Sequence, residues 1–160
     1  MCYCNPNWII SLCEATKDDL SLLLAWRNHP EVMKYFIEQK GPIVWENHCA
    51  WWHKRRNRID WMIVVDTGQS VRRVGSVNAS NLETLSPSVG IFIGEVTLWG
   101  QGVAKKALVL ALDWLNRMRY VQAGATIVKS NERSIRLFES VGFVRIGEAR
   151  EGEWEYRKSL

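Results

Sequence analysis

The spacing of apolar side chains predicts one strand and then helices in the first part of the chain. Residues 8–15 form an apolar, β-prone run, and Thr16 can cap the helix that follows. Leucines at helical spacing predict that helix over residues 20–27. A second helical period begins at Trp45 and leads into a basic run at residues 53–58, which we interpret as the solvated end of that helix.

The rest of the chain alternates between strand and helix patterns. Two β-rich runs, residues 61–65 and 71–77, flank a turn-forming cluster and predict a hairpin. The further elements, in chain order, are a strand over 89–93, a helix over 103–119, a strand over 125–128, a helix over 132–140, and a hairpin made of 143–146 and 154–157. This order indicates a mixed sheet covered by helices, an α/β or α+β fold.

Composition and charge narrow the classes of function. With 160 residues, 47% of them hydrophobic, the chain can build one core, and we expect residues 1–160 to form a single domain. A formal charge of +4 suits a small phosphorylated ligand, whereas nucleic-acid binding usually needs a larger excess. A nucleic-acid-binding domain that uses the run at 53–58 is kept as an alternative. No segment reaches the ~20 apolar residues of a membrane span, so we expect a cytoplasmic protein without membrane or nucleic-acid partners, as a monomer or a homodimer.

The four cysteines are at positions 2, 4, 13 and 49, which is neither a disulfide framework nor a zinc-binding spacing. We interpret them as reduced thiols and expect no bound metal. Cys2 and Cys4 are the pair for which metal binding is kept as an alternative.

Two glycines stand directly before the long helix predicted over residues 103–119. Gly100 and Gly102 let the chain turn tightly and bring main-chain N–H groups toward a bound anion, and the helix dipole adds about half a positive charge there. A diphosphate fits these groups, with Lys105 and Lys106 able to reach further oxygens. The stretch lacks the Gly-Lys-Ser/Thr of a Walker loop, and Lys105 replaces the third glycine of a dinucleotide fingerprint. A loop without a ligand is the alternative.

A second stretch, residues 131–143, has the features of a capped helix. Asn131 can cap it, and Ser134 lies one turn in on the same face. Gly142 ends the helix, so that Phe143 begins a strand. Taken by itself, an ordinary helix explains this pattern.

Together and in this order, the two stretches resemble the GNAT superfamily of N-acetyltransferases. The phosphate-loop pattern of that family, Arg/Gln-x-x-Gly-x-Gly/Ala, is matched by Gly102 and Ala104, while Trp99 stands at the Arg/Gln position. The family's later pattern, Asn-x-x-Ser/Ala-x-x-Leu-Tyr-x-x-x-Gly-Phe, is matched at Asn131, Ser134, Leu137, Gly142 and Phe143. The Trp-Gly-x-Gly sequence and residues 25–32 look like the RimJ/RimL-like branch, including its amino-sugar acetyltransferases of the PseH type.

The resemblance implies a GNAT fold and acetyl-CoA as the cofactor. Such a fold has a mixed sheet of about six or seven strands and about four helices. The sheet parts between its fourth and fifth strands, here 89–93 and 125–128, and main-chain groups around Phe92 and Ile93 hold the pantetheine arm in the gap. The cofactor-binding residues that the resemblance implies are Ile91, Phe92, Ile93, Trp99, Gly100, Gln101, Gly102, Val103, Ala104, Lys105, Asn131, Ser134, Arg136 and Phe138.

The residues that would transfer protons depart from the family pattern. Phe138 stands where the family has the tyrosine that protonates the departing thiolate, so Ser134 is our candidate for that step. Ser88 stands where many members carry a glutamate base, and Glu95, just past the same strand, is our candidate to act through a water. In the alternative, Ser134 packs against the cofactor without chemistry and Glu95 is a solvated loop residue.

Four residues lie in segments that border the acceptor cleft in this family, and we expect them to bind substrate: Arg27, Asn28, His48 and Trp52. In the alternative, Trp26, Trp51 and Trp52 serve packing and His48 is exposed.

The function that the resemblance implies is transfer of an acetyl group from acetyl-CoA to a primary amine of an amino sugar or other small molecule, by direct attack on the thioester. One alternative acceptor is the N-terminal amine of a protein. Another alternative is a non-catalytic module that senses acetyl-CoA, because the chain lacks both the tyrosine and the glutamate of the family.

We expect Gly102→Asp to abolish the thermal stabilisation that acetyl-CoA gives the wild-type protein, because a carboxylate would face the diphosphate. Melting temperatures of both proteins, measured with and without acetyl-CoA, check this. An unchanged ligand-induced shift in the variant contradicts the diphosphate site.

Overall fold

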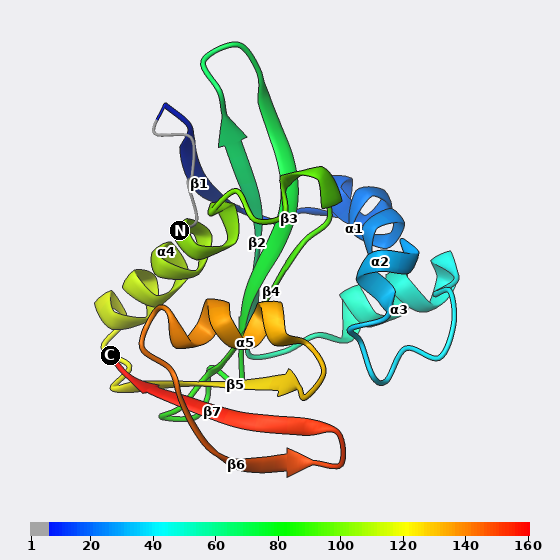
Figure 1. Ribbon diagram of the computed structural model, residues 1–160. Helices are drawn as coiled ribbons and strands as arrows, with labels where there is room; N and C mark the ends of the chain where they lie inside the picture. The colour runs from blue at the N-terminus through cyan, green and yellow to red at the C-terminus, as the bar shows by residue number, and fades with distance from the viewer. Residues whose placement is uncertain (1–6) are drawn as a thin grey trace.

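A computed structural model describes residues 7–160 as a seven-stranded sheet with helices on both faces (Figure 1). The strands are β1 (Ile9–Glu14), β2 (Arg58–Asp66), β3 (Val71–Ser80), β4 (Ser88–Ile93), β5 (Gln122–Val128), β6 (Val144–Arg150) and β7 (Glu153–Ser159). The helices are α1 (Leu20–Arg27), α2 (Pro30–Met33), α3 (Trp45–Lys54), α4 (Val103–Arg117) and α5 (Glu132–Glu139), with the 3-10 helices η1 (Lys17–Asp19) and η2 (Val96–Leu98). The predicted order of strands and helices is confirmed. Cys2 and Cys4 lie outside the described residues.

The sheet is mixed and opens at one pair of strands. Its order is β1-β2-β3-β4-β5-β7-β6, and every neighbouring pair is antiparallel except β4 and β5. Within the described chain, β4 and β5 pair at a single position, Ser88 with Gly124, whereas β3 and β4 pair at six. β4 therefore stays against β3 while its other side leaves β5, which confirms the predicted parting of the sheet.

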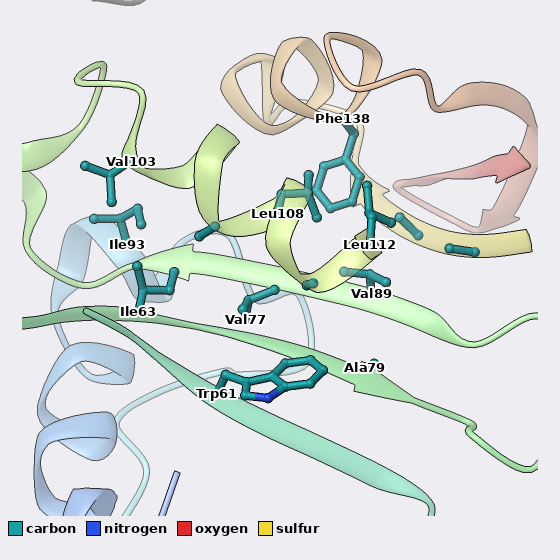
Figure 2. Close-up of a cluster of buried hydrophobic side chains, with 14 of the residues drawn as sticks. Trp61, Ile63, Val77, Ala79, Val89, Ile93, Val103, Leu108, Leu112 and Phe138 are labelled. Atoms are coloured by element: carbon teal, nitrogen blue, oxygen red, sulfur yellow. The ribbon is translucent and has the colours of Figure 1, made fainter. Parts of the chain in front are cut away.

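Each face of the sheet has its own hydrophobic core. α4 packs on one face, where its buried side chains meet Ile63 and Val77. Figure 2 shows Phe138 of α5 in the same cluster, beside Leu108. On the other face, α1 and α3 pack over Met62. Neighbouring residues of β2 thus enter opposite cores, because successive side chains of a strand alternate between the faces.

The basic run at residues 53–58 is not simply a solvated helix end, which corrects the interpretation from sequence. β2 already begins at Arg58, inside the run. Arg55 and Arg58 each bind the buried carboxylate of Asp60 at 2.8 Å. The Arg55 guanidinium also lies 3.0 Å from the centroid of the Trp52 ring. A buried carboxylate requires such partners, and the helical period of α3 could not reveal one that lies on the next strand.

No helix in the part of the chain that the structure describes is long and apolar enough to cross a membrane. In the same part, no three His, Cys, Asp or Glu side chains gather where they could hold a metal ion. Cys13 and Cys49 are free thiols, as predicted.

Gly94 follows β4 and allows α1 to approach the sheet closely. A Cβ added to Gly94 would lie 2.1 Å from Cγ of Trp26, whose side chain is 5% exposed. The indole therefore occupies the space that any larger residue at position 94 would need.

We expect Gly94→Ala to lower the free energy of unfolding by ~1–3 kcal/mol, because the added methyl group overpacks a buried ring. Urea unfolding midpoints check this. Gly41→Ala is the matched control, since nothing lies within 4 Å of a Cβ at position 41 and its φ is not in the left-handed region. Equal midpoints for the two variants contradict the close packing.

Candidate active site

The main chain of β4 presents polar groups to the gap beside it. The Gly94 N–H donates to a β3 carbonyl at 2.9 Å. The Phe92 carbonyl also faces β3, since a Cβ added to Gly75 would lie 2.3 Å from its oxygen. Alternate residues of a strand direct their main-chain groups to opposite sides, so those of Ile91 and Ile93 face the gap. The expectation that the Phe92 main chain lines the gap is thereby corrected.

The loop after β4 turns sharply twice before α4 begins. Gly100 and Gly102 have φ values of 78° and 77°, in the left-handed region that favours glycine. Gly102 is the N-cap of α4, and among residues 7–160 no side chain caps that helix end. The amides of Val103, Ala104 and Lys105 lie in the first turn, where no intrahelical carbonyl can accept from them. These N–H groups and the helix dipole fit the diphosphate of the expected cofactor.

Trp99 connects the two sides of the parted sheet. Its indole N–H donates to the Ile93 carbonyl at 2.8 Å. The Arg133 guanidinium, at the start of α5, lies 4.2 Å from the centroid of the Trp99 ring. Sequence reasoning missed Arg133, because motif spacing does not show that α5 returns to the loop after β4. Gln101 in the same loop is exposed.

α5 places its four predicted site residues in different surroundings. Asn131 Oδ1 accepts from the Ser134 amide at 3.1 Å, which confirms Asn131 as the helix cap. Ser134 is half-buried, whereas Arg136 is exposed and paired with a glutamate one turn earlier. Phe138 is 3% exposed, and its ring packs on Phe143 with 5.0 Å between centroids. Cofactor contacts by these four residues stay predictions.

Glu95 is oriented at the end of β4. Its main-chain N–H and that of Gly94 both donate to the Val74 carbonyl, so the strand bulges there. The Glu95 carboxylate is half-buried and accepts from Trp26 Nε1 at 3.2 Å. It is therefore turned toward the face of the sheet that α1 covers. A catalytic role for Glu95 stays a prediction.

Aromatic rings form a wall between β4 and α1. The Phe92 ring meets Trp26 and Phe36 edge-on, with centroids 6.4 Å and 5.9 Å away. The packing alternative is confirmed for Trp26 and Trp52, which are 5% and 7% exposed, but Trp51 is 37% exposed. The wall places the ring of Phe92 on the α1 side of the gap.

Arg27 and Asn28 hold the loop between α2 and α3. Asn28 Nδ2 donates to the Ile43 carbonyl at 2.8 Å, and Asn28 Oδ1 accepts from the Ile43 amide at 2.7 Å. Arg27 Nε and Nη2 donate to Gln39 Oε1 at 3.3 and 3.1 Å. Burial, and then the charge of Arg58, lowers the pKa of Arg27 to about 10. Sequence reasoning missed Gln39, which lies in a loop without a periodic pattern.

His48 is buried, which corrects the alternative in which it is exposed. It is 5% exposed, and its ring stacks on Trp51 at 5.5 Å between centroids. Its Nε2 has no hydrogen-bond partner among residues 7–160. Burial lowers the pKa of His48; a hydrogen bond to the main chain at Leu20 opposes this, and the charge of Arg27 adds to it. Substrate contacts by His48 and Trp52 stay predictions.

The loop between α2 and α3 also reaches the hairpin of β6 and β7. Glu38 accepts from Arg150 at 2.5 Å. A Cβ added to Gly152 would lie 3.3 Å from Cδ1 of Ile37. Because the same loop packs on β4 through Phe36, it spans the opening between β4 and the strands beyond it.

Residues 10–144 match the model of the acetyltransferase (GNAT) domain family. The chain belongs to this family. The match includes β4, α4, α5 and the loop of residues 99–102, called the glycine loop below. These elements build the site described above.

Both a curated protein and a solved domain from Methanocaldococcus jannaschii resemble this GNAT domain. An uncharacterized protein of that species is 45% identical over 151 residues, which are 94% of this chain, and the chain spans 31% of the length of that curated relative. The crystal structure of a domain from the same species has a TM-score of 0.94 at 44% identity and covers 96% of this chain and 99% of that one.

A second solved structure is spermidine N-acetyltransferase from Vibrio cholerae, in complex with CoA and spermine. Its TM-score is 0.78 at 18% identity, and the match covers 94% of this chain and 93% of that one. At this level of identity the likeness concerns the fold.

We expect His48 to make the protein less stable in mild acid. Because the folded-state pKa lies below that of the unfolded chain, the unfolded state takes up a proton first, and the free energy of unfolding falls as the pH drops below about 6.5. His48→Phe keeps an aromatic ring but cannot bind the proton, so its urea midpoint should depend less on pH. His53→Phe, at an exposed position, is the control. The same pH dependence in wild type and His48→Phe excludes this linkage.

Proposed function

We propose that this GNAT domain transfers an acetyl group from acetyl-CoA to the primary amine of a small molecule, with an amino sugar as the first candidate. The observation that carries the proposal is the parted sheet, because the open edge of β4 leads to the uncapped start of α4. An extended pantetheine arm can pair with such an edge, and a diphosphate can accept from the amides of residues 100–105. The Trp-Gly-x-Gly sequence supports placing the protein in the RimJ/RimL-like branch. We also propose that it acts in the cytoplasm.

Acetyl-CoA supplies an activated thioester, which an uncharged amine can attack directly once the two are held in contact. The main-chain N–H groups of Ile91 and Ile93 face the gap. We assign to one of them a hydrogen bond to the thioester oxygen, which gains negative charge as the amine adds. One such donor is typically worth ~3–4 kcal/mol of transition-state stabilisation. The rigid pairing of β4 with β3 keeps this donor in place.

In this proposal, Glu95 and Ser134 carry out the proton transfers. Glu95 accepts the proton that the ammonium form of the acceptor must lose, through a water, and the N–H of Trp26 orients its carboxylate. Ser134 donates its hydroxyl proton to the departing thiolate and regains one from a solvent water, while Glu95 releases to solvent the proton that it has taken up. Phe138 cannot do so, because its ring has no ionisable group and is buried in the core.

The acceptor binds on the α1 side of β4 in this proposal. The ring of Phe92, the Glu95 carboxylate and the Arg27 guanidinium all lie on that side. Asn28 acts by fixing the main chain at Ile43, while His48 and Trp52 support the same region from α3. A sensor of acetyl-CoA without catalysis is the second candidate, and the burial of Phe138 at the position of the family's tyrosine favours it.

The experiment is a thiol-release assay with acetyl-CoA and panels of amino sugars, polyamines, aminoglycosides and peptides. We expect amine-dependent release of CoA with an amino sugar as the best acceptor. Peptides as the best acceptors identify a protein N-terminal acetyltransferase instead. Stabilisation by acetyl-CoA without release for any amine contradicts the enzyme and supports the sensor.

Ser134→Ala is the matched test of proton return in that assay. We expect kcat to fall ~10²-fold, the usual scale of acid catalysis, while the Kd for acetyl-CoA changes little. Ser140→Ala is the control, because Ser140 is an exposed serine at the other end of α5. Equal kcat values for wild type and Ser134→Ala remove Ser134 from the mechanism.

A further inference from the structure

One guanidinium on the acceptor side of the sheet has no carboxylate partner. Among residues 7–160, the ion pairs do not include Arg27. Its Nε and Nη2 donate to the neutral side chain of Gln39, and its carbon lies 3.7 Å from the centroid of the Phe36 ring. A half-buried positive charge that has only an amide and an aromatic ring as partners is incompletely compensated.

The charged groups around Arg27 increase this imbalance. Arg58 is close enough for its charge to lower the pKa of Arg27. The carboxylate of Asp60 is shared between Arg58 and Arg55, so two guanidinium groups already use it. Burial and the charge of Arg27 both lower the pKa of His48, so His48 does not offset the charge of Arg27.

The carboxylates of neighbouring elements already have partners of their own. Glu31 on α2 pairs with Lys34, and Glu38 in the following loop accepts from Arg150. Glu95 after β4 accepts from the indole N–H of Trp26. None of these carboxylates pairs with Arg27, so among residues 7–160 its guanidinium has no ion-pair partner.

Arg27 is also connected to β4 through aromatic side chains. The Phe36 ring contacts both the Arg27 guanidinium and the Phe92 ring of β4. An acceptor whose amine reaches the open edge of β4 would thus extend along this aromatic wall and place its far end near Arg27. A guanidinium binds phosphate and carboxylate through paired, charge-assisted hydrogen bonds.

We infer that the acceptor amine carries an anionic group, a phosphate or a carboxylate, which Arg27 binds. This inference rests on the proposed acetyl transfer and specifies its substrate class. It separates this protein from enzymes whose acceptors are polycations such as spermine, because a second ammonium group would meet the charge of Arg27.

The test compares acceptors that differ in charge, in the thiol-release assay with acetyl-CoA. The anionic amines are glucosamine 6-phosphate, glucosamine 1-phosphate, UDP-glucosamine and 2-amino-2-deoxyglucuronate, and the others are glucosamine, spermine and kanamycin. We expect kcat/KM for the best anionic acceptor to exceed that of every neutral or cationic one at least tenfold. The phosphates and the uronate separate the two kinds of anion.

Arg27→Gln should reduce that preference to near unity, mainly by raising KM for the anionic acceptor, and Arg27→Lys should keep part of it. Gln39→Met removes the hydrogen bonds to Arg27 but keeps its charge, so it reports on a loop-holding role by itself. Arg72→Gln, an exposed arginine on the β2–β3 hairpin, is the surface control. Acetyl-CoA-induced melting shifts confirm that each variant is folded.

A neutral or cationic amine as the best acceptor overturns the inference, as does an equal loss of preference in Gln39→Met and Arg27→Gln. Turnover of neutral or cationic amines without turnover of any anionic amine overturns it as well. Failure to bind acetyl-CoA, or binding without turnover of any amine, contradicts the proposed function itself, so the two failures are distinguishable.

Discussion

The site depends on main-chain N–H groups, at the open edge of β4 and in the first turn of α4, to which the fold of residues 7–160 gives no strand or helix partner. β4 pairs with β3 along its length but meets β5 only where Ser88 faces Gly124, within the residues described. A strand edge inside a protein must find other hydrogen bonds, and the first turn of α4 has the same need. Because both sets of groups meet at the glycine loop, an extended ligand with an anionic end can satisfy them together. The left-handed φ values of Gly100 and Gly102 make that meeting sterically accessible.

Packing on each face of the sheet positions a different part of the site. On the α4 face, packing fixes the start of the helix, because Val103 is 1% exposed and anchors the first turn in the core. On the α1 face, the indole of Trp26 fills the space beside Gly94 and also directs the Glu95 carboxylate. Rigid apolar packing therefore positions both a helix dipole and an ionisable group, and neither relies on a flexible loop.

Local patterns in the sequence predicted the strands, the helices and the glycine loop. Contacts between segments that are distant in the sequence could not be predicted from these patterns. Helical and strand periods are properties of consecutive residues, so α4, α5 and the β2–β3 hairpin could be located by spacing. Asn131 was predictable as a cap for the same reason. The contact of Arg133 with Trp99 and the sharing of Asp60 by two arginines depend on how elements fold back on one another. The direction of the Phe92 carbonyl depends on strand register, which side-chain patterns leave open.

The link between the α2–α3 loop and the last hairpin joins Glu38 to Arg150, 112 positions later in the chain. The glycine loop, by contrast, is positioned by β3, β4 and α4, which are close to one another in the sequence. Closing a long loop costs more conformational entropy and comes later than closing a short one. The glycine loop can therefore form while the α2–α3 loop is still free of the last hairpin, and we expect the contact between Glu38 and Arg150 to close later in folding.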